Sequence, residues 1–410
     1  MATVYKSELD IPAKSSFSLK DKSLKLDNLE QVQPYLDELS SKKDLQKIDL
    51  SGNTISPEAS KYLASGILKH KDTLEELNLQ DIYTSRDKNE IPASLTEFFA
   101  VIERLPHLRV LNLSDNAFGQ DTIEVLEGFV SKSKYIEHLI ISNNGLGPFS
   151  GARLGKALYR MAKLRDASEE KDKNVRSLKT FWCGRNRLES GSSELLALGL
   201  RANKNLKEIR LYQNGIRPNG IARLIFHGLS HLHDLEVLDL DDNTFTWPGS
   251  VALADSLSKW PELKELNVND CLLKARGCVK LLEKLAEFSD KSKLETLKMQ
   301  YNELDDSSLK LLVALLPNLK NHSILELNGN RFEEDSEYVD RINSIFAIKG
   351  TGSLDELDDL EELDSEDEEE EEGEDGEDGD ESEQEEDEEE RKKVEDKLAT
   401  LEKDLAETHI

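Results

Sequence analysis

One group of residues with spacing that could serve chemistry is a glycine cluster. Gly145, Gly147 and Gly151 lie between an expected strand and an expected helix, as in a dinucleotide-binding glycine loop. The same register in other repeats reads Asn53-Thr54-Ile55-Ser56-Pro57 or Asn214-Gly215-Ile216-Arg217-Pro218. The cluster is therefore interpreted as a turn that happens to be rich in glycine, and the sequence contains no phosphate-binding G-x-x-x-x-G-K-[ST] motif.

A second group consists of histidines. His227 and His231 are four residues apart, a spacing that would place both on one face of a helix and could ligate a metal, with His233 nearby. No carboxylate or cysteine completes a ligand set in the sequence around them. We therefore predict a structural role for all three and no metal site.

The third group is the cysteines. Cys183, Cys271 and Cys278 form an odd set without a C-x-x-C pair, which argues against a disulfide framework or a structural zinc site. We expect Cys271 and Cys278 to be packed rather than reactive. Because no Ser/His/Asp or Cys/His arrangement stands out either, the sequence indicates a protein that binds a partner and is not itself an enzyme.

Behind these groups lies a repeated pattern of apolar residues that ends in a polar position. The pattern reads apolar, two residues, apolar, one residue, apolar, two residues, then asparagine or cysteine, as in Leu108-Leu111-Leu113-Asn116. Its last position is occupied by Asn53, Asn116, Asn144, Asn186, Asn214, Asn243, Cys271, Asn302 and Asn330. This is the signature of leucine-rich repeats, in which a short strand is followed by an asparagine that bonds neighbouring backbone groups.

The repeat spacing predicts the fold class. The polar position recurs after 28 or 29 residues from 186 through 214 and 243 to 271, and again from 302 to 330. Segments such as 57–68 between the strands have helical apolar spacing. We predict an α/β leucine-rich-repeat solenoid over residues 1–348, a ribonuclease-inhibitor-like horseshoe of about ten or eleven repeats. A degenerate copy at 24–29 is expected to cap its start. Surplus residues at 81–92 and 163–176 are expected on opposite rims.

Charge separates this body from the rest of the chain. The formal net charge is −31, and 27 of the 84 acidic residues fall between Asp355 and Glu390, where there is no Lys or Arg. We predict a disordered acidic tail over 349–390. It is interpreted as a solvated spacer, with diffuse cation binding or mimicry of nucleic acid toward basic partners as alternatives. A short helix is expected over 391–410.

The targeting signals of secreted and membrane proteins are not seen in this sequence. The first residues are charged rather than apolar, and the longest apolar runs fall well short of the ~20 residues of a membrane span. We expect an intracellular protein in a reducing compartment.

A row of exposed positions is expected immediately before the asparagine ladder. In successive repeats this position is held by Asp81, Asp115, Asn143, Arg185, Gln213, Asp242 and Asp270. The ladder does not need these side chains, so they can face a partner or simply water. Trp182 occupies the outward slot of its strand, where partner contact and packing against a neighbour are both reasonable interpretations.

The motifs of these repeats resemble those of the fungal Ran GTPase-activating proteins. The resemblance rests on segments that follow the strands, among them Asp81-Ile82-Tyr83-Thr84-Ser85-Arg86, Asn143-Asn144-Gly145-Leu146-Gly147-Pro148, Cys183-Gly184-Arg185-Asn186-Arg187-Leu188 and Leu327-Asn328-Gly329-Asn330-Arg331-Phe332. It runs through essentially all repeats and into the acidic tail. Ser85 departs from the glycine that is common in the family.

The resemblance implies a role for particular residues. Asn143 matches the asparagine that orients the catalytic glutamine of the small GTPase Ran, in a family that uses no arginine finger. Arg86 matches an arginine that supports the complex, and we expect it to be exposed. Two repeats at ~4.8 Å per strand place it about 10 Å from Asn143. Lys88 is a candidate companion. The remaining partner-binding candidates are Asp115, Trp182, Arg185, Asp242 and Asp270.

The resemblance also implies partners and location. Ran in its GTP form is the expected partner, with a Ran-binding protein as a further candidate. The protein needs no cofactor, because GTP and Mg are bound by the GTPase. We expect a monomer that acts in nucleocytoplasmic transport without contacting nucleic acid or membrane. Cytoplasmic residence is expected, with shuttling or the nuclear envelope as alternatives. The rival interpretation is an acidic leucine-rich histone-binding protein, whose arrays are shorter.

Overall fold

The computed structural model describes residues 5–361 and 380–407. Its contacts divide the chain into two compact units, which are described in turn. The first unit contains Met1–Ser192 and Ala202–Asn214, and the second contains Ser193–Arg201 and Gly215–Ile410.

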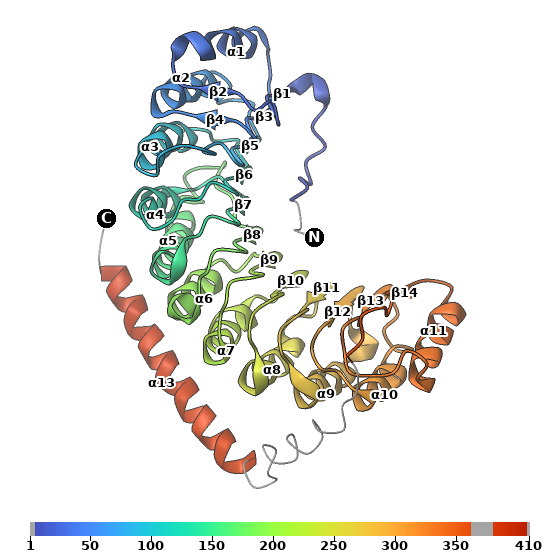
Figure 1. Ribbon diagram of the computed structural model, residues 1–410. Coiled ribbons are helices and arrows are strands. Elements are labelled where there is room, and N and C mark those ends of the chain that lie inside the picture. The colour runs from blue at the N-terminus through green and yellow to red at the C-terminus, as the bar shows by residue number, and fades with distance from the viewer. Residues whose placement is uncertain (1–4, 362–379, 408–410) are drawn as a thin grey trace. The chain divides into compact units, whose positions relative to one another are not determined.

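The first unit is a parallel sheet with helices along one side (Figure 1). Its strands lie in the order β1 (Ser16–Ser18), β3 (Lys47–Asp49), β5 (Glu76–Asn78), β6 (Val110–Asn112), β7 (His138–Ile140), β8 (Thr180–Trp182) and β9 (Glu208–Arg210). The helices are α1 (Leu29–Ser41), α2 (Pro57–Leu68), α3 (Glu90–Ile102), α4 (Ile123–Lys132) and α5 (Gly147–Ser168). A separate pair is formed by β2 (Lys25–Leu26) and β4 (Thr54–Ile55).

The second unit repeats this arrangement. Its parallel strands are β10 (Val237–Asp239), β11 (Glu265–Asn267), β12 (Thr296–Lys298), β13 (Ile324–Glu326) and β14 (Ser353–Leu354). Its helices are α6 (Ser193–Ala202), α7 (Pro218–His227), α8 (Thr246–Ser256), α9 (Lys274–Ala286), α10 (Asp306–Leu315), α11 (Glu337–Lys349) and α13 (Asp380–Glu407).

Each three-residue strand of the sheet buries its central residue, as the two-residue alternation of a strand requires. Ile48, Leu77, Leu111 and Phe181 are almost completely buried between the strands and the helices. The α/β leucine-rich-repeat solenoid predicted from the spacing is therefore confirmed.

The predicted asparagine ladder runs along the turns that follow the strands. The backbone N–H of Asn116 donates to Oδ1 of Asn144 at 2.9 Å, and the N–H of Asn144 donates to Oδ1 of Asn186 at 3.0 Å. The amide nitrogen of Asn144 donates in turn to the carbonyls of Ile141 at 3.0 Å and Leu113 at 3.1 Å. Each asparagine thus satisfies backbone groups of its own repeat and of a neighbour.

The limits of the array differ from those expected. The sheet starts at β1, upstream of the expected cap at 24–29, because Leu26 pairs with β4 and not with a strand of the main sheet. The array also continues past residue 348. The Asp355 carboxylate accepts from the N–H groups of Leu327 at 2.7 Å and Asn328 at 3.1 Å and so closes the last turn.

The acidic segment is also divided differently from the prediction. Residues 349–361, expected to be disordered, contain β14 and the turn that Asp355 holds. Helix α13 begins at Asp380 and not at residue 391, so residues 380–390 are helical. The rest of the predicted tail, residues 362–379, lies outside the described residues, as do the last residues of the expected helix, 408–410.

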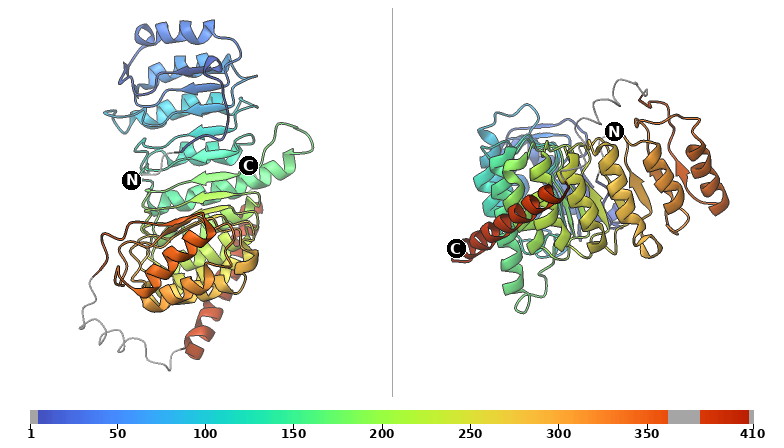
Figure 2. Two further views of the ribbon diagram at one scale, coloured as in Figure 1. Left: turned by 90° about the vertical axis from the view of Figure 1, so that its right-hand side faces the viewer. Right: turned by 90° about the horizontal axis from the view of Figure 1, so that it is seen from below.

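Helix α5 takes up part of the surplus expected at 163–176. It extends to Ser168 and projects beyond the neighbouring helices of its unit (Figure 2). Across the described ranges, no helix combines the length and apolar character needed to cross a membrane.

Candidate functional site

The turn residues before the ladder share an unusual backbone conformation. In the first unit, φ is +49° at Asp81, +61° at Asp115, +56° at Asn143, +55° at Arg185 and +52° at Gln213. This left-handed region is disfavoured for residues with a Cβ, and Asn and Asp tolerate it best. Asn143, Arg185 and Gln213 are exposed, whereas Asp81 and Asp115 are half-buried. The first unit therefore presents a row of polar side chains in fixed turns.

Asn143 is held by its neighbour in this row. Its amide nitrogen donates to Oδ1 of Asp115 at 2.6 Å. The other carboxylate oxygen of Asp115 accepts from Nε2 of Gln80, also at 2.6 Å. This chain of hydrogen bonds fixes the orientation of the exposed amide.

Gln80 was not among the residues singled out from the sequence. The contact between Asp115 and Asn143 could have been anticipated, because both occupy the same register of adjacent strands and strands lie ~4.8 Å apart. Gln80 is one position earlier in its own turn, and only the turn conformation brings it to Asp115.

The expectation that Arg86 is exposed is wrong. Its side chain is only 9% exposed and forms an ion pair with Asp27 at 2.6 Å. Its guanidinium also donates to Oγ1 of Thr54 at 3.1 Å and to the carbonyl of Leu26 at 3.2 Å. Glu90 lies 3.7 Å away on the next helix. The arginine thus connects the 81–89 segment to the β2–β4 pair.

The electrostatics of this contact stabilise the charged form of Asp27. Burial opposes ionisation of Asp27, but the hydrogen bond and charge of Arg86 outweigh it and lower the pKa of that carboxyl. The segment itself contains a further left-handed turn, with Ser85 at φ +66°. This is a conformation for which glycine is better suited than serine.

Lys88 is the exposed cation of the same segment. Its side chain is 75% exposed and pairs only loosely with Asp121, at 3.2 Å on the surface. An exposed pair of this kind contributes little to stability, on the order of 0–1 kcal/mol, and can be exchanged for a partner.

Trp182 is not a free contact residue. It is 5% exposed, because Tyr5 meets its ring edge-on at 5.4 Å and Leu9 packs on the same cluster with Val110 and Ile140. The N-terminal segment lies along the strand side of the first unit (Figure 1). Packing by this segment therefore replaces the exposure that was considered for Trp182.

In the second unit, Asp242 and Asp270 are exposed at the equivalent turn positions, with φ of +51° and +50°. Their carboxylates and that of Asp239 act on Asp241. Burial, followed by these negative charges, raises the pKa of Asp241 to about 7. Acidic crowding is thus the main feature of this part of the second unit.

The histidine and cysteine candidates are held in structural contacts. His227 bonds Glu395 at 2.9 Å. Cys183, Cys271 and Cys278 are buried, and burial raises the pKa of Cys183 to about 12. Because the thiolate is the reactive form, these thiols are chemically quiet. Within the part of the chain that the structure describes, no cluster of His, Cys, Asp and Glu side chains is arranged to hold a metal ion.

Together these features define a leucine-rich-repeat protein with a preorganised polar rim. The leucine-rich-repeat family model matches residues 104–121. Pig ribonuclease inhibitor, which shares this class of fold, is 23% identical over 62% of this chain and 58% of its own length.

Closer relatives identify the family. Ran GTPase-activating protein 1 of Saccharomyces cerevisiae is 46% identical over 80% of this chain and 82% of its own length. Ran GTPase-activating protein of Drosophila melanogaster is 30% identical over 78% of this chain, which spans 53% of that protein. The chain belongs to the family of Ran GTPase-activating proteins.

Proposed function

We propose that this protein accelerates GTP hydrolysis by the small GTPase Ran and that the bond-breaking machinery belongs to Ran. The observation that carries the proposal is the hydrogen-bonded row Gln80, Asp115 and Asn143, which holds one exposed amide in a fixed direction. Membership of the family favours this function over histone binding.

The amide of Asn143 has the chemistry to position a glutamine. It can donate and accept at once, and Asp115 holds one of its donors. A glutamine of the partner held in this way can orient the water that attacks the γ-phosphate of GTP. Since orientation is fixed before the partner arrives, the GTPase does not have to order this group during the reaction.

Arg86 supports this arrangement from within the protein. Its bonds to Asp27, Thr54 and Leu26 anchor the segment that carries Lys88. An arginine committed in this way is poorly placed to enter another protein's nucleotide site, which supports activation without an arginine finger. Lys88 and Arg185 are exposed and are proposed to contact the GTPase surface.

The remaining expectations are part of the same proposal. The partner is Ran carrying GTP and Mg, with a Ran-binding protein as a further component, and the activator acts as a monomer in the cytoplasm. Asp115, Asp242 and Asp270 are proposed partner-facing acids, and Asp115 also positions Asn143.

The experiment is a single-turnover GTP hydrolysis assay with a panel of small GTPases and catalytic amounts of this protein. We expect stimulated hydrolysis with Ran and with none of the other GTPases in the panel. Arg185→Ala and Arg187→Ala test for an arginine finger, because both residues are exposed in the turn after β8, which neighbours the turn that carries Asn143. A fall of ~10³ or more in the maximal rate for either variant is the signature of a finger and would contradict the proposed mechanism.

A further inference from the structure

The C-terminal helix α13 lies against the outer helices of the second unit. Residues on one of its faces, at the i, i+3, i+4 and i+7 spacing of a helix, contact α6 and α7. On this face Val394 is 6% exposed and Leu398 is completely buried. A solvated charged spacer helix would bury neither residue.

Polar contacts surround this apolar pair. Glu395 accepts from Arg201 of α6 at 2.9 Å and bonds His227 of α7 at the same distance. Lys397 pairs with Glu194 of α6 at 2.6 Å. Because the two helices contribute charges of both signs, the contact specifies the direction and register of the bound helix as well as its position.

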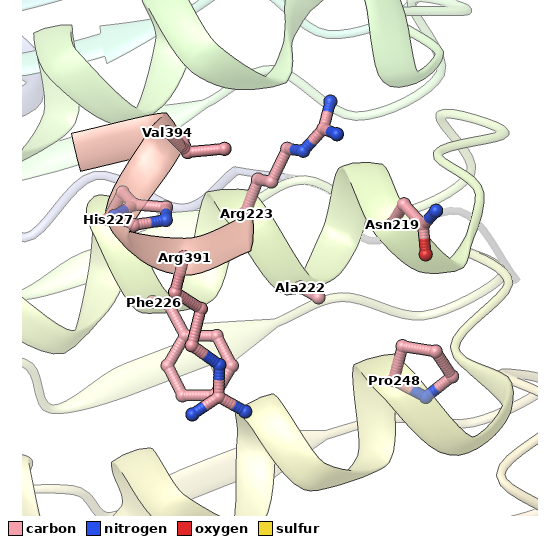
Figure 3. A pocket seen from close by; sticks show the side chains of 8 residues that line it. All are labelled: Asn219, Ala222, Arg223, Phe226, His227, Pro248, Arg391 and Val394. Carbon is pink, nitrogen blue, oxygen red and sulfur yellow. The ribbon is translucent and has the colours of Figure 1, made fainter. Parts of the chain in front are cut away.

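At the N-terminal end of the contact, Arg391 of α13 stacks on the ring of Phe226 of α7. Figure 3 shows Arg391 of α13 over Phe226 of α7, with Val394 one turn further along α13. The guanidinium carbon lies 3.7 Å from the ring centroid, well within cation–π range. Asn219, Ala222 and Pro248 line the adjoining pocket.

We propose that the outer face of α6 and α7 is a binding surface for an amphipathic helix and that the chain's own α13 is its ligand. The docked helix is covalently tethered, through residues 362–379, to the turn held by Asp355, Asp359 and Glu361. In that turn Arg331 pairs with Glu361 at 2.8 Å.

The tether explains how a small contact can hold the helix. Covalent connection within one chain gives the helix an effective concentration on the order of 1 mM at this face. A face with an intrinsic Kd of about 100 μM would then be occupied ~90% of the time. A helix of another protein with the same pattern of side chains would compete for this face. It would displace α13 only if the ratio of its concentration to its Kd exceeded the ratio of ~10 that the tether gives α13.

The experiment is hydrogen exchange of the full-length protein. We expect amides of residues 391–402 to exchange about tenfold more slowly in the wild type than in Leu398→Asp, which places a charge in the buried contact. Ala399→Asp is the matched control, because it introduces the same residue at the next, exposed position and should retain protection. Arg201→Ala changes α6 and leaves α13 unaltered, and residues 391–402 should lose protection in this variant too.

Three results would overturn the proposal. Equal exchange in the wild type and Leu398→Asp would mean that the helix is not docked. Equal loss in Leu398→Asp and Ala399→Asp would mean that the effect is one of helix stability. Protection that rises with protein concentration, together with a dimer by light scattering, would place α13 on a second copy. An unchanged thermal transition of the repeats in each variant shows that the fold is intact.

Discussion

At the residue scale, the difference between Asn143 and Asn144 shows how one position separates structure from function. Asn144 is 1% exposed and shares its amide among backbone groups of adjacent repeats. Asn143 is exposed, and its side-chain amide donates to the carboxylate of Asp115. Two consecutive asparagines therefore have different roles. Asn144 is buried inside the turn and holds the backbone, whereas Asn143 is exposed to a partner.

We predict that Asn143→Ala lowers the maximal rate of stimulated GTP hydrolysis by ~10²–10³ while the affinity for the GTPase changes little, because positioning groups act mainly in the transition state. Single-turnover hydrolysis at saturating activator measures this loss. Asn144→Ala is the control and should instead lower the thermal midpoint. A near-normal rate for Asn143→Ala would remove the residue from the mechanism.

Asp115 is predicted to act through Asn143. Asp115→Ala should reduce the maximal rate by ~10- to 100-fold, because a hydrogen bond to a charged group contributes about 1.5–3 kcal/mol and each ~1.4 kcal/mol corresponds to tenfold. The readout is a double-mutant cycle. If Asp115 only positions Asn143, the pair of substitutions costs no more than Asn143→Ala alone, and additive losses would show an independent role.

Asp241 provides a prediction about pH. Its pKa of about 7 in the fold lies above the ordinary value of 3.8, so the folded state retains a proton that the unfolded chain has released. The protein therefore loses stability as pH rises from about 4 to 7. Asp241→Asn cannot ionise and should raise the thermal midpoint by about 1–3 °C at pH 8 and by less at pH 5. A pH-independent difference would contradict this origin.

At the element scale, the segment after β5 depends on contacts distant in sequence. Arg86 meets Asp27 and Leu26, which belong to the start of the chain. The repeat pattern predicted that surplus residues lie on this rim, but it carries no information on pairing between an insertion and a separate two-stranded element. The same holds for Trp182, since its cover by Tyr5 and Leu9 comes from residues outside any repeat.

We predict that Arg86→Ala destabilises the first unit and weakens activation together. The loss should be about 1–3 kcal/mol, below the ~3–5 kcal/mol for a fully buried pair, because Asp27 remains one-third exposed. Thermal unfolding and the concentration dependence of stimulation measure the two effects. Lys88→Ala is the matched control on the same segment and should change only the concentration dependence. An unaltered midpoint for Arg86→Ala would refute the anchoring role.

Elements that follow the repeat rule were predictable in type and position. The apolar triplets located every strand of the main sheet from β3 to β13, because the same burial pattern recurs in each. The ends were not predictable, since β14 has only Leu354 to mark it and owes its place to Asp355. Terminal elements cap a stack by contacts of individual residues, and such contacts produce no repeated pattern in the sequence.

At the scale of the whole molecule, the end of the repeat array can be tested by a pair of truncations. A chain ending at Glu361 should unfold cooperatively at nearly the full-length temperature. A chain ending at Gly350 should unfold on the order of 5 °C lower, because it lacks β14 and the carboxylate that bonds Leu327 and Asn328. Calorimetry of the two chains decides the matter, and equal midpoints would show that β14 contributes nothing.

The left-handed turns before the ladder also limit how this surface can change during evolution. A side chain at such a position must tolerate positive φ, which β-branched residues do poorly and Asn, Asp and Gly do well. The turns at Asp115, Asn143 and Arg185 therefore draw on a reduced alphabet of amino acids. A mutant library built to redirect this rim toward another GTPase should therefore leave Val, Ile and Thr out of these positions, so that more of its variants fold.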